Sequence, residues 1–331
     1  MKHNQIRIKK PLISVIIVNY NGKHLLKRVI ESLKKQNFSG GMEIIVVDND
    51  STDGSRNFIK KNYKYVKWVQ NKENLSYPGA NSGIKAASGD YVLFTNNDVE
   101  FKNDCISKMY NVLANDKSIG MTVPKLINYY NRKIDSKGTW VSRSFYCGHL
   151  TYGSDDKLKI VPYMGIGLLG MDIIRKLGYL LDTDYFLYAE DLDLCLRLRL
   201  LGYNVVYVPD AIIYHVHSAT MDKYSTSARK TFLLEKNLLT TFFKICSFNN
   251  ILILLPYVIS MRFILMLKDL ITFKFNIFFA RLKALFWVIF NVRKIYRKRK
   301  HVQTIRKRSD KFLFKVFNEK EMLMAMKNAP I

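Results

Sequence analysis

The stretch DYVLFTNNDVEF, Asp90–Phe101, begins like a buried strand and becomes polar within a single residue. Five mostly apolar residues, Tyr91–Thr95, lead directly into Asn96, Asn97 and Asp98. Asn and Asp accept the backbone angles of tight turns, so this polar triplet is compatible with a simple turn. Side chains at the carboxyl end of a strand in an α/β sheet also bind metals and phosphates. The stretch alone leaves both interpretations open.

The first hundred residues alternate between short β-branched segments and amphipathic segments. The segments that we predict as strands are Leu12–Val18, Glu43–Asp48, Tyr65–Gln70 and Tyr91–Thr95. The segments that we predict as helices between them are Lys23–Gln36, Thr52–Asn62 and Gly79–Ala87. Strand–helix alternation at this spacing predicts an α/β fold in which a mostly parallel sheet is flanked by helices.

Polar clusters follow three of these predicted strands, at Asn19–Gly22, Asp48–Ser55 and Asn96–Asp98. The carboxyl ends of parallel strands lie at one edge of a sheet, and ligands bind beyond that edge. One polar strand end is compatible with a turn, whereas three on the same edge predict a shared site.

Two of these clusters suggest distinct chemistry. Residues 50–52 can simply cap the next helix, but Asp48 and Asn49 also offer acceptor and donor groups suited to a nucleobase edge. Asp98 is the only carboxylate of the third cluster. Oxygen ligands suit Mg²⁺ or Mn²⁺, and a single carboxylate leaves coordination positions for a nucleotide diphosphate.

The segment Tyr188–Tyr203 is ambiguous in its periodicity. Leucines at alternate positions from 192 to 200 favour a strand, whereas the length, the acidic first turn and Gly202 as a stop favour a helix. We predict a helix. Asp193 and Arg197, four residues apart, then form an ordinary structural pair.

Two further segments carry candidate site residues. Glu190 and Asp191 can be the acidic first turn of that helix, or can supply a general base that accepts a proton from an attacking hydroxyl. His215 and His217 lie at alternate positions at the end of a predicted strand, and we expect at most one of them to reach a site. We select His215 as a ligand of a metal or a diphosphate.

The composition places the excess positive charge near the carboxyl terminus. The chain has 331 residues, 48% of them hydrophobic, and a formal net charge of +26. From Met261 onward there are 18 Lys or Arg against four Asp or Glu, a net charge of +14. Such a basic region favours nucleic acid or anionic lipid as a partner. Four scattered cysteines favour a reducing compartment, and the first residues show no signal peptide.

The last ninety residues are apolar and basic without strand signals. The longest uncharged run, Ile245–Met261, falls short of the roughly 20 residues of a spanning helix. The following Phe273–His301 mixes aromatics and cations as interfacial helices do. We expect residues 241–331 to hold the protein on the cytoplasmic face of an anionic membrane without crossing it. A basic helical bundle packed on the first domain is the alternative.

Five motifs, in this order, resemble the family 2 glycosyltransferases of GT-A fold, particularly the rhamnosyltransferase-like branch. The motifs are SVIIVNYNG, EIIVVDNDSTDGS, ANSGIKAASGDYVLFTNND, FLYAEDLDLCLRLRLLGY and VYVPDAIIYHVHS. The resemblance covers about residues 11–240. It implies a catalytic domain at 1–240, with a nucleotide-sugar half at 11–100 and an acceptor half at 101–240, followed by the membrane-associating region at 241–331.

The resemblance also implies roles for individual residues. The residues that it places in nucleotide-sugar binding are Asn19, Tyr20, Asp48, Asn49, Asn81, Asn96 and Asn97. Asp98 would bind Mg²⁺ or Mn²⁺ with His215 nearby, and Asp191, beside Glu190, would be the catalytic base. Asn96 stands where the family usually has Asp.

The implied reaction is a single displacement that inverts the anomeric centre, with a nucleotide-diphosphate sugar as donor and a glycan or lipid-linked hydroxyl as acceptor. A dehydrogenase would need Gly-x-Gly-x-x-Gly, where NYNGKH offers only Gly22. A processive polysaccharide synthase would need several spanning helices and a Gln-x-x-Arg-Trp motif. A non-catalytic basic adaptor would leave the acidic strand ends unexplained. We expect no nucleic-acid partner, because the basic region is too apolar.

Overall fold

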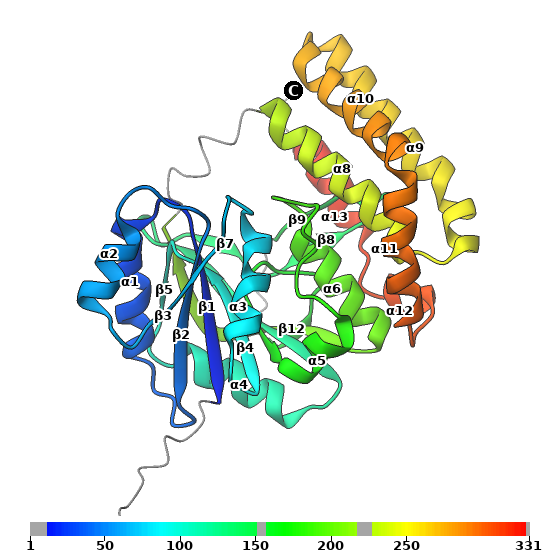
Figure 1. Cartoon of the computed structure of the whole chain (residues 1–331). Coiled ribbons are helices and arrows are strands. Elements are labelled where there is room, and N and C mark those ends of the chain that lie inside the picture. The colour runs from blue at the N-terminus through cyan, green and yellow to red at the C-terminus, as the bar shows by residue number, and fades with distance from the viewer. Residues whose placement is uncertain (1–11, 151–156, 217–226, 329–331) are drawn as a thin grey trace, which may run out of the picture.

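The computed structural model describes residues 12–150, 157–216 and 227–328 as an α/β body with a group of helices at one end (Figure 1). The strands are β1 (Ile13–Asn19), β2 (Met42–Asp48), β3 (Lys67–Gln70), β4 (Tyr91–Asn96), β5 (Val99–Phe101), β6 (Ile119–Asn128), β7 (Ile134–Ser136), β8 (Thr139–Val141), β9 (Cys147–His149), β10 (Lys159–Ile160), β11 (Gly167–Gly170) and β12 (Asn204–His215).

The helices of the amino-terminal part are α1 (Lys23–Lys34), α2 (Ser55–Asn62), the 3₁₀ turn η1 (Tyr77–Gly79), α3 (Ala80–Ala86), α4 (Cys105–Asn115), α5 (Met171–Leu177) and α6 (Glu190–Leu201). The helices of the carboxyl-terminal part are α8 (Ser227–Ile245), α9 (Phe248–Ile271), α10 (Phe275–Phe290), α11 (Val292–Thr304), α12 (Asp310–Phe314) and α13 (Glu319–Asn328).

The central sheet has the order β10-β12-β6-β11-β4-β1-β2-β3, with β5 paired to β12 and β7 to β6. Strand β1 runs parallel to β2 and β4, and β2 runs parallel to β3. Strand β11 lies antiparallel between β4 and β6. The predicted α/β fold is confirmed. The sheet is parallel in its first half and mixed in its second.

The continuous apolar run of β1 is explained by burial on both of its faces. Ile16 and Val18 belong to the core that contains Ala80 of α3, while Val15 and Ile17 belong to the core beneath α1. Strands that are covered by helices on both faces have no solvent side, so their sequence does not alternate with polar residues.

Helix α6 resolves the ambiguous leucine periodicity. Every residue from Leu192 to Leu201 is buried, so the helix has no polar face and its sequence cannot show helical periodicity. It ends at Gly202, whose φ of 100° lies in the left-handed region that glycine tolerates. The predicted helix and its stop are confirmed.

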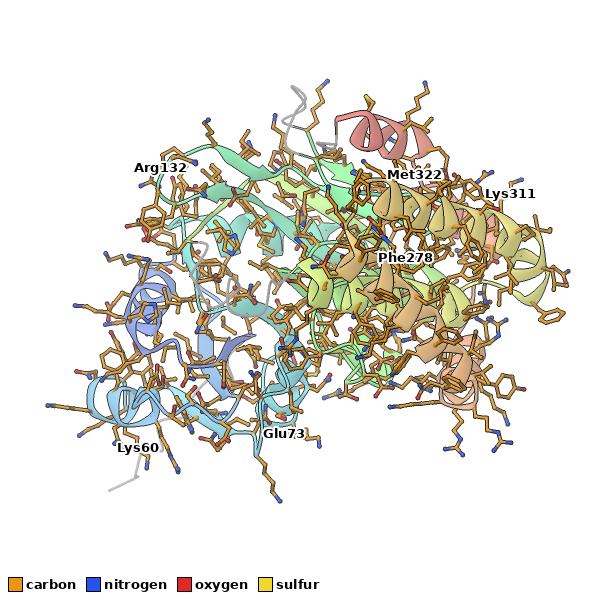
Figure 2. The ribbon with its side chains drawn as sticks, turned by 90° about the horizontal axis from the view of Figure 1, so that it is seen from above. Lys60, Glu73, Arg132, Phe278, Lys311 and Met322 are labelled. Atoms are coloured by element: carbon orange, nitrogen blue, oxygen red, sulfur yellow. The ribbon has the colours of Figure 1, made fainter. Side chains whose placement is uncertain are left out.

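The carboxyl-terminal helices share a core with the amino-terminal part. Leu238 and Phe242 of α8, Val288 of α10 and Val302 of α11 belong to the same buried cluster as the leucines of α6. Helices α9 and α10 lie side by side at the end of the molecule opposite α1 and α2 (Figures 1 and 2).

Helix α9 corrects one expectation from the sequence. Within residues 12–150, 157–216 and 227–328, α9 is the one helix that is by itself long and apolar enough to span a membrane, and α10 with α11 qualifies only as a pair bent by 70°. The apolar run does not end at Arg262, because that side chain is buried and its Nε lies 3.2 Å from Glu235 Oε2 on α8. A cation that faces the protein adds no charge to the outer face of the helix.

Candidate active site at the strand ends

The three polar strand ends meet through direct hydrogen bonds. Asn19, at the end of β1, donates from Nδ2 to Asp48 Oδ1 over 2.8 Å at the end of β2. Its Oδ1 accepts a bond of 2.8 Å from Asn97 Nδ2, which follows β4. All three strand ends therefore contribute to one network, as the sequence predicted.

Asp48 is almost fully buried and organises the loop after β2. Its Oδ1 accepts from Ser51 Oγ at 2.6 Å, and its Oδ2 accepts from the Ser51 backbone N–H at 2.8 Å and from Gln70 Nε2 at 3.0 Å. Sequence reasoning missed Gln70 because a glutamine at the end of a weak edge strand carries no local signal. The carboxylate is thus held in a fixed direction at the sheet edge.

Asn49 is buried in a second set of amide contacts. Its Nδ2 donates to Ser76 O at 2.7 Å, and its Oδ1 accepts from Asn71 Nδ2 at 2.8 Å. A Cβ on Gly79 would lie 2.4 Å from Asn49 Oδ1, so only glycine permits this approach. Gly22 is constrained in the same way, since its Cβ would lie 2.0 Å from Asn97 Nδ2.

Asn81 lies elsewhere. Its Nδ2 donates to Pro78 O at 3.0 Å and Leu181 O at 2.7 Å, and its Oδ1 accepts from the backbone N–H groups of Leu180 and Leu181 at 3.1 Å each. These contacts occupy both amide hydrogens and both acceptor positions of the side chain. The structure therefore uses Asn81 to tie α3 to the segment that precedes α6. Tyr20 and Asn96 are half-buried at the ends of β1 and β4.

Asp98 and His215 lie close together. His215 Nε2 lies 3.4 Å from Asp98 Oδ2, and its Nδ1 lies 3.6 Å from Asp135 Oδ2 of β7. The Val216 N–H donates to Asp98 O at 2.8 Å, which fixes the two chain segments. Burial lowers the pKa of His215, but the two carboxylates outweigh it and raise that pKa above its usual value. Asp135 was missed by sequence reasoning, and His217 lies outside the described residues.

The donor set fits a divalent cation that is bound together with an anionic ligand. Across the described ranges, no three His, Cys, Asp or Glu side chains form a complete metal-binding group. Asp98 and His215 nevertheless provide one carboxylate and one imidazole, and Asp135 faces the second ring nitrogen. A carboxylate on the far nitrogen is the usual way of orienting a metal-binding histidine. The incomplete protein set leaves positions for ligand oxygens.

The acidic pair begins α6. Asp191 is half-buried and accepts a bond of 2.8 Å from the Leu192 N–H, and its neighbour Glu190 is buried. Burial raises the pKa of Asp191 to about 6. Burial, together with the charge of Asp191, raises the pKa of Glu190 to about 8. Burial and the nearness of the two acids therefore both oppose ionisation of the pair, and the ionisation of one acid raises the pKa of the other.

Tyr77 connects this pair to the strand ends. Its hydroxyl donates to Gly165 O, and Asp191 Oδ2 lies 3.4 Å from the position of a Cβ on Gly165. Gly167 lies opposite Phe94 in the pairing of β11 with β4, which brings Gly165 to the level where β4 ends. Burial and then the charges of Glu190, Asp191 and Asp98 raise the pKa of the Tyr77 phenol. Glu190, Asp191 and Asp98 therefore all lie close enough to Tyr77 to affect its ionisation.

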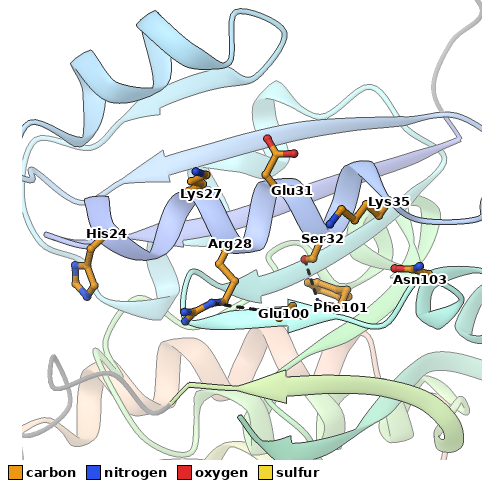
Figure 3. A pocket seen from close by; sticks show the side chains of 9 residues that line it. All are labelled: His24, Lys27, Arg28, Glu31, Ser32, Lys35, Glu100, Phe101 and Asn103. Atoms are coloured by element: carbon orange, nitrogen blue, oxygen red, sulfur yellow. Dashed lines mark hydrogen bonds and ion pairs between the residues drawn. The ribbon is translucent and has the colours of Figure 1, made fainter. Parts of the chain in front are cut away.

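A surface pocket lined by residues of α1 and β5 is distinct from this region. It has a volume of about 640 Å³ and lies between α1 and β5, as Figure 3 shows. Arg28 Nε lies 3.8 Å from Glu100 Oε2 across it, and Lys27 and Lys35 line it from α1. The pocket is open and lined by side chains of both charges, and its lining residues are not those of the strand-end network.

The strand-end region has the parts of a group-transfer site. A half-buried carboxylate with a raised pKa can accept a proton from a hydroxyl near neutral pH. Asp98 and His215 can hold a cation, and the amide-rich strand ends of β1, β2 and β4 offer directed polar groups for an anionic ligand.

Comparisons with known proteins also indicate a group-transfer enzyme. Residues 14–164 match the family described as Glycosyl transferase family 2. Rhamnosyltransferase WbbL of Escherichia coli K12 is 23% identical over 65% of this chain and 86% of that protein. UDP-Glc:alpha-D-GlcNAc-diphosphoundecaprenol beta-1,3-glucosyltransferase WfgD of Escherichia coli is 26% identical over 54% of this chain and 69% of that protein.

The solved structures extend the likeness to the fold. The crystal structure of GalNAc-T7 with UDP, GalNAc and Mn²⁺ matches with a TM-score of 0.58 at 18% identity, over 71% of this chain and 48% of that chain. Some curated relatives are much longer, and this chain spans only 26% and 19% of the length of two of them.

The acidic pair makes a prediction about stability. Both pKa values are raised in the folded state, so the pair stabilises the fold fully below about pH 4, and this contribution is lost as pH rises through about 6 and about 8. Glu190→Gln removes the ionisation of the more shifted group. We expect the native protein to lose stability relative to Glu190→Gln by a few kcal/mol between about pH 5 and about pH 9. Urea denaturation across this range measures it, and parallel pH profiles would contradict the assignment.

Proposed function

We propose that the protein is an inverting, metal-dependent, non-processive glycosyltransferase, and the match of residues 14–164 to Glycosyl transferase family 2 supports this proposal. It transfers one sugar from a nucleotide-diphosphate donor to a hydroxyl of a glycan or lipid-linked acceptor. The observation that carries the proposal is the half-buried Asp191. Its pKa is raised to about 6, and it lies near Gly165, at the level of the carboxyl end of β4 and of Asp98, which follows that strand.

The donor is proposed to lie over the ends of β1, β2 and β4. Asn19, Asn97 and Asp48 are fixed there by mutual bonds, so their remaining hydrogen-bonding capacity points in set directions. Asp98 and His215 would hold Mg²⁺ or Mn²⁺, which supplies positive charge next to the leaving diphosphate. The GT-A structure with UDP and Mn²⁺ supports a divalent cation and leaves its identity open.

The acceptor is proposed to approach Asp191. Its hydroxyl gives its proton to the Asp191 carboxylate while the oxygen forms a bond to the anomeric carbon. The bond between that carbon and the diphosphate breaks on the opposite side, and the electron pair leaves with the nucleotide. One displacement inverts the anomeric configuration. Glu190 stays protonated at neutral pH and so leaves the single charge of the pair on the base.

Replacing the base provides the first test. Asp191→Asn should lower kcat by about 10²–10⁴-fold while UDP binding in the presence of Mn²⁺ stays native, because the general base acts only in the chemical step. Release of nucleoside diphosphate from a panel of UDP- and dTDP-sugars selects the donor and measures kcat. Glu190→Gln is the matched control and should retain most of the rate, since it mimics the protonated acid. Native turnover by a folded Asp191→Asn protein would remove Asp191 from the mechanism.

The cation site has a separate test. Asp98→Ala should weaken UDP binding in the presence of Mn²⁺ by about tenfold or more and abolish the dependence of that binding on Mn²⁺, since Asp98 is the carboxylate of the donor set. Titration calorimetry with UDP, with and without Mn²⁺, measures both. The cluster is a simple turn if native UDP binding needs no divalent cation.

We also propose that the outer face of α9 and α10 docks on a membrane. The large side chains exposed on this face are Leu252, Ile253, Phe263, Ile264, Leu267 and Ile271 of α9 and Phe275, Phe279, Phe286, Ile289 and Phe290 of α10. An apolar patch of this extent marks an interaction surface. The adjacent α11 exposes Arg293, Lys294, Arg297 and Lys300, which fits anionic headgroups.

The inner face of α9 favours a helix that lies on the membrane over one that spans it. Arg262 is paired with Glu235, and Asp269 Oδ2 accepts from Arg281 Nε at 2.8 Å. A spanning helix would separate these buried pairs and expose their charges to hydrocarbon, at about 2.5–3.5 kcal/mol for each charge. A flat orientation keeps the pairs and buries only the outer face. All four cysteines are free, which fits the cytoplasmic side.

Liposome flotation tests the membrane face. The native protein should float with anionic liposomes at low salt, and Phe263→Glu with Leu267→Glu should reduce the floating fraction strongly. Both side chains are more than half exposed, at 59% and 58%, so the fold should tolerate the change. Tyr65→Glu, which alters a 53% exposed ring near β3, is the control. A native protein that remains at the bottom of the gradient would exclude the proposed face.

A further inference from the structure

The turn that precedes the acidic pair is conformationally unfavourable. Within Asp182–Ala189, three non-glycine residues have positive φ: Phe186 at 59°, Tyr188 at 72° and Ala189 at 62°. L-residues disfavour this region, so such a turn persists only where its surroundings impose it. Glu190 and Asp191 follow at once as the first residues of α6. The direction of the Asp191 carboxylate therefore depends on what holds the turn.

One buried side chain of α8, that of Asn237, contacts three backbone carbonyl groups of this turn. Asn237 has no exposed surface, and its Nδ2 lies 3.0 Å from Tyr185 O, 3.0 Å from Leu187 O and 2.7 Å from Tyr188 O. The two amide hydrogens are shared among these three acceptors. Three carbonyl oxygens surround a single nitrogen, so the orientation of the amide is fixed by chemistry: an amide oxygen in that place could accept no bond from any of them.

The same face of α8 contacts the rest of the turn. Lys236 Nζ donates to Asp184 O at 2.9 Å. Thr241 Oγ1 lies 2.8 Å from Tyr185 Oη, and Lys244 Nζ lies 2.5 Å from Asp182 Oδ2. Positions 237, 241 and 244 are spaced by three or four residues, so they lie on one face of α8, and this face contacts the turn from Asp182 to Tyr188.

We propose that Asn237 is a positioning residue that aims Asp191 through this turn. The inference rests on the proposed role of Asp191 as the base. Helix α8 ends at Ile245 and α9 begins at Phe248, so the helices that carry the apolar face also set the conformation of the turn before the acids. The carboxyl-terminal region is thereby a working part of the active site as well as an anchor.

Asn237→Ala in the full chain tests the proposal. It leaves the strand-end network untouched, so UDP binding in the presence of Mn²⁺ should stay within about twofold of native. Turnover of the donor selected by the nucleotide-sugar screen should fall by about 10–100-fold in kcat, because an angstrom of misplacement at a catalytic group has effects of this size. The difference in pH-dependent stability between the parent and its Glu190→Gln derivative should also shrink, since a relaxed turn lets water reach the pair.

Thr240→Ala is the matched control on the same helix. Thr240 is also buried, but its hydroxyl donates to Lys236 O at 2.7 Å, inside α8. It should keep native kcat and native proton linkage. Thr241→Val removes the contact with Tyr185 and the bond of 2.9 Å from the Thr241 hydroxyl to Asn237 O inside α8, and leaves the Asn237 side chain in place. It provides a milder variant if Asn237→Ala fails to fold, and should lower kcat several-fold with UDP binding unchanged.

The outcomes separate the two proposals. Native kcat and native proton linkage in a folded Asn237→Ala protein, or in Thr241→Val if Asn237→Ala does not fold, would overturn the positioning role. An equal loss of kcat in Thr240→Ala would overturn it as well, because the effect would then be general destabilisation of α8. Native kcat in Asp191→Asn would instead refute the base itself, whatever the Asn237 variants do.

Discussion

A lysine without exposed surface, Lys244 of α8, ties the parts of this molecule together. Its Nζ lies 2.5 Å from Asp182 Oδ2 and 2.7 Å from Asp193 Oδ1, and Asp193 in turn pairs with the buried Arg197 of α6. A buried charge without a partner is strongly destabilising, so these four groups are stable only when α8, α6 and the turn before α6 are in register. This requirement links the carboxyl-terminal helices to the helix that presents the acidic pair.

The active region itself joins distant parts of the chain. Hydrogen bonds from Asn19 to Asp48 and from Asn97 to Asn19 unite three strand ends, while Tyr77 reaches Gly165 beside Asp191. Between these groups, β11 runs antiparallel beside β4 and brings the second half of the chain against the first. One sheet thus places both the proposed donor-binding strand ends and the proposed base, and relative movement of the two halves would have to break the hydrogen bonds between β11 and β4.

The carboxyl-terminal helices divide their residues by chemistry. Charges on their inner faces are paired, as Glu235 is with Arg262, whereas the outer faces of α9 and α10 are almost wholly apolar. Cations of α11 are also divided: Arg299 donates to Phe243 O, while Arg293 and Arg297 are exposed. The high net charge is therefore partly internal, and only the exposed share can attract anionic lipid.

The sequence by itself determined the four parallel strands of the first half, the helix at α6 and the three polar strand ends that converge. Each of these features depends on residues that are close together in the chain, because strand burial, helix capping and polar strand ends all leave a local sequence pattern. It also singled out Asp191, Asp98 and His215, whose neighbours in the chain carry the family motifs. It could not determine that Asn81 bridges two segments, that Asp135 faces His215, or that Arg262 turns inward to Glu235. These facts, like the grip of Asn237 on the turn before Glu190, depend on residues roughly 50 or more positions apart, or on helices that meet only when the core forms. Only the tertiary structure decided them, because no local pattern records which buried donor will face which buried acceptor.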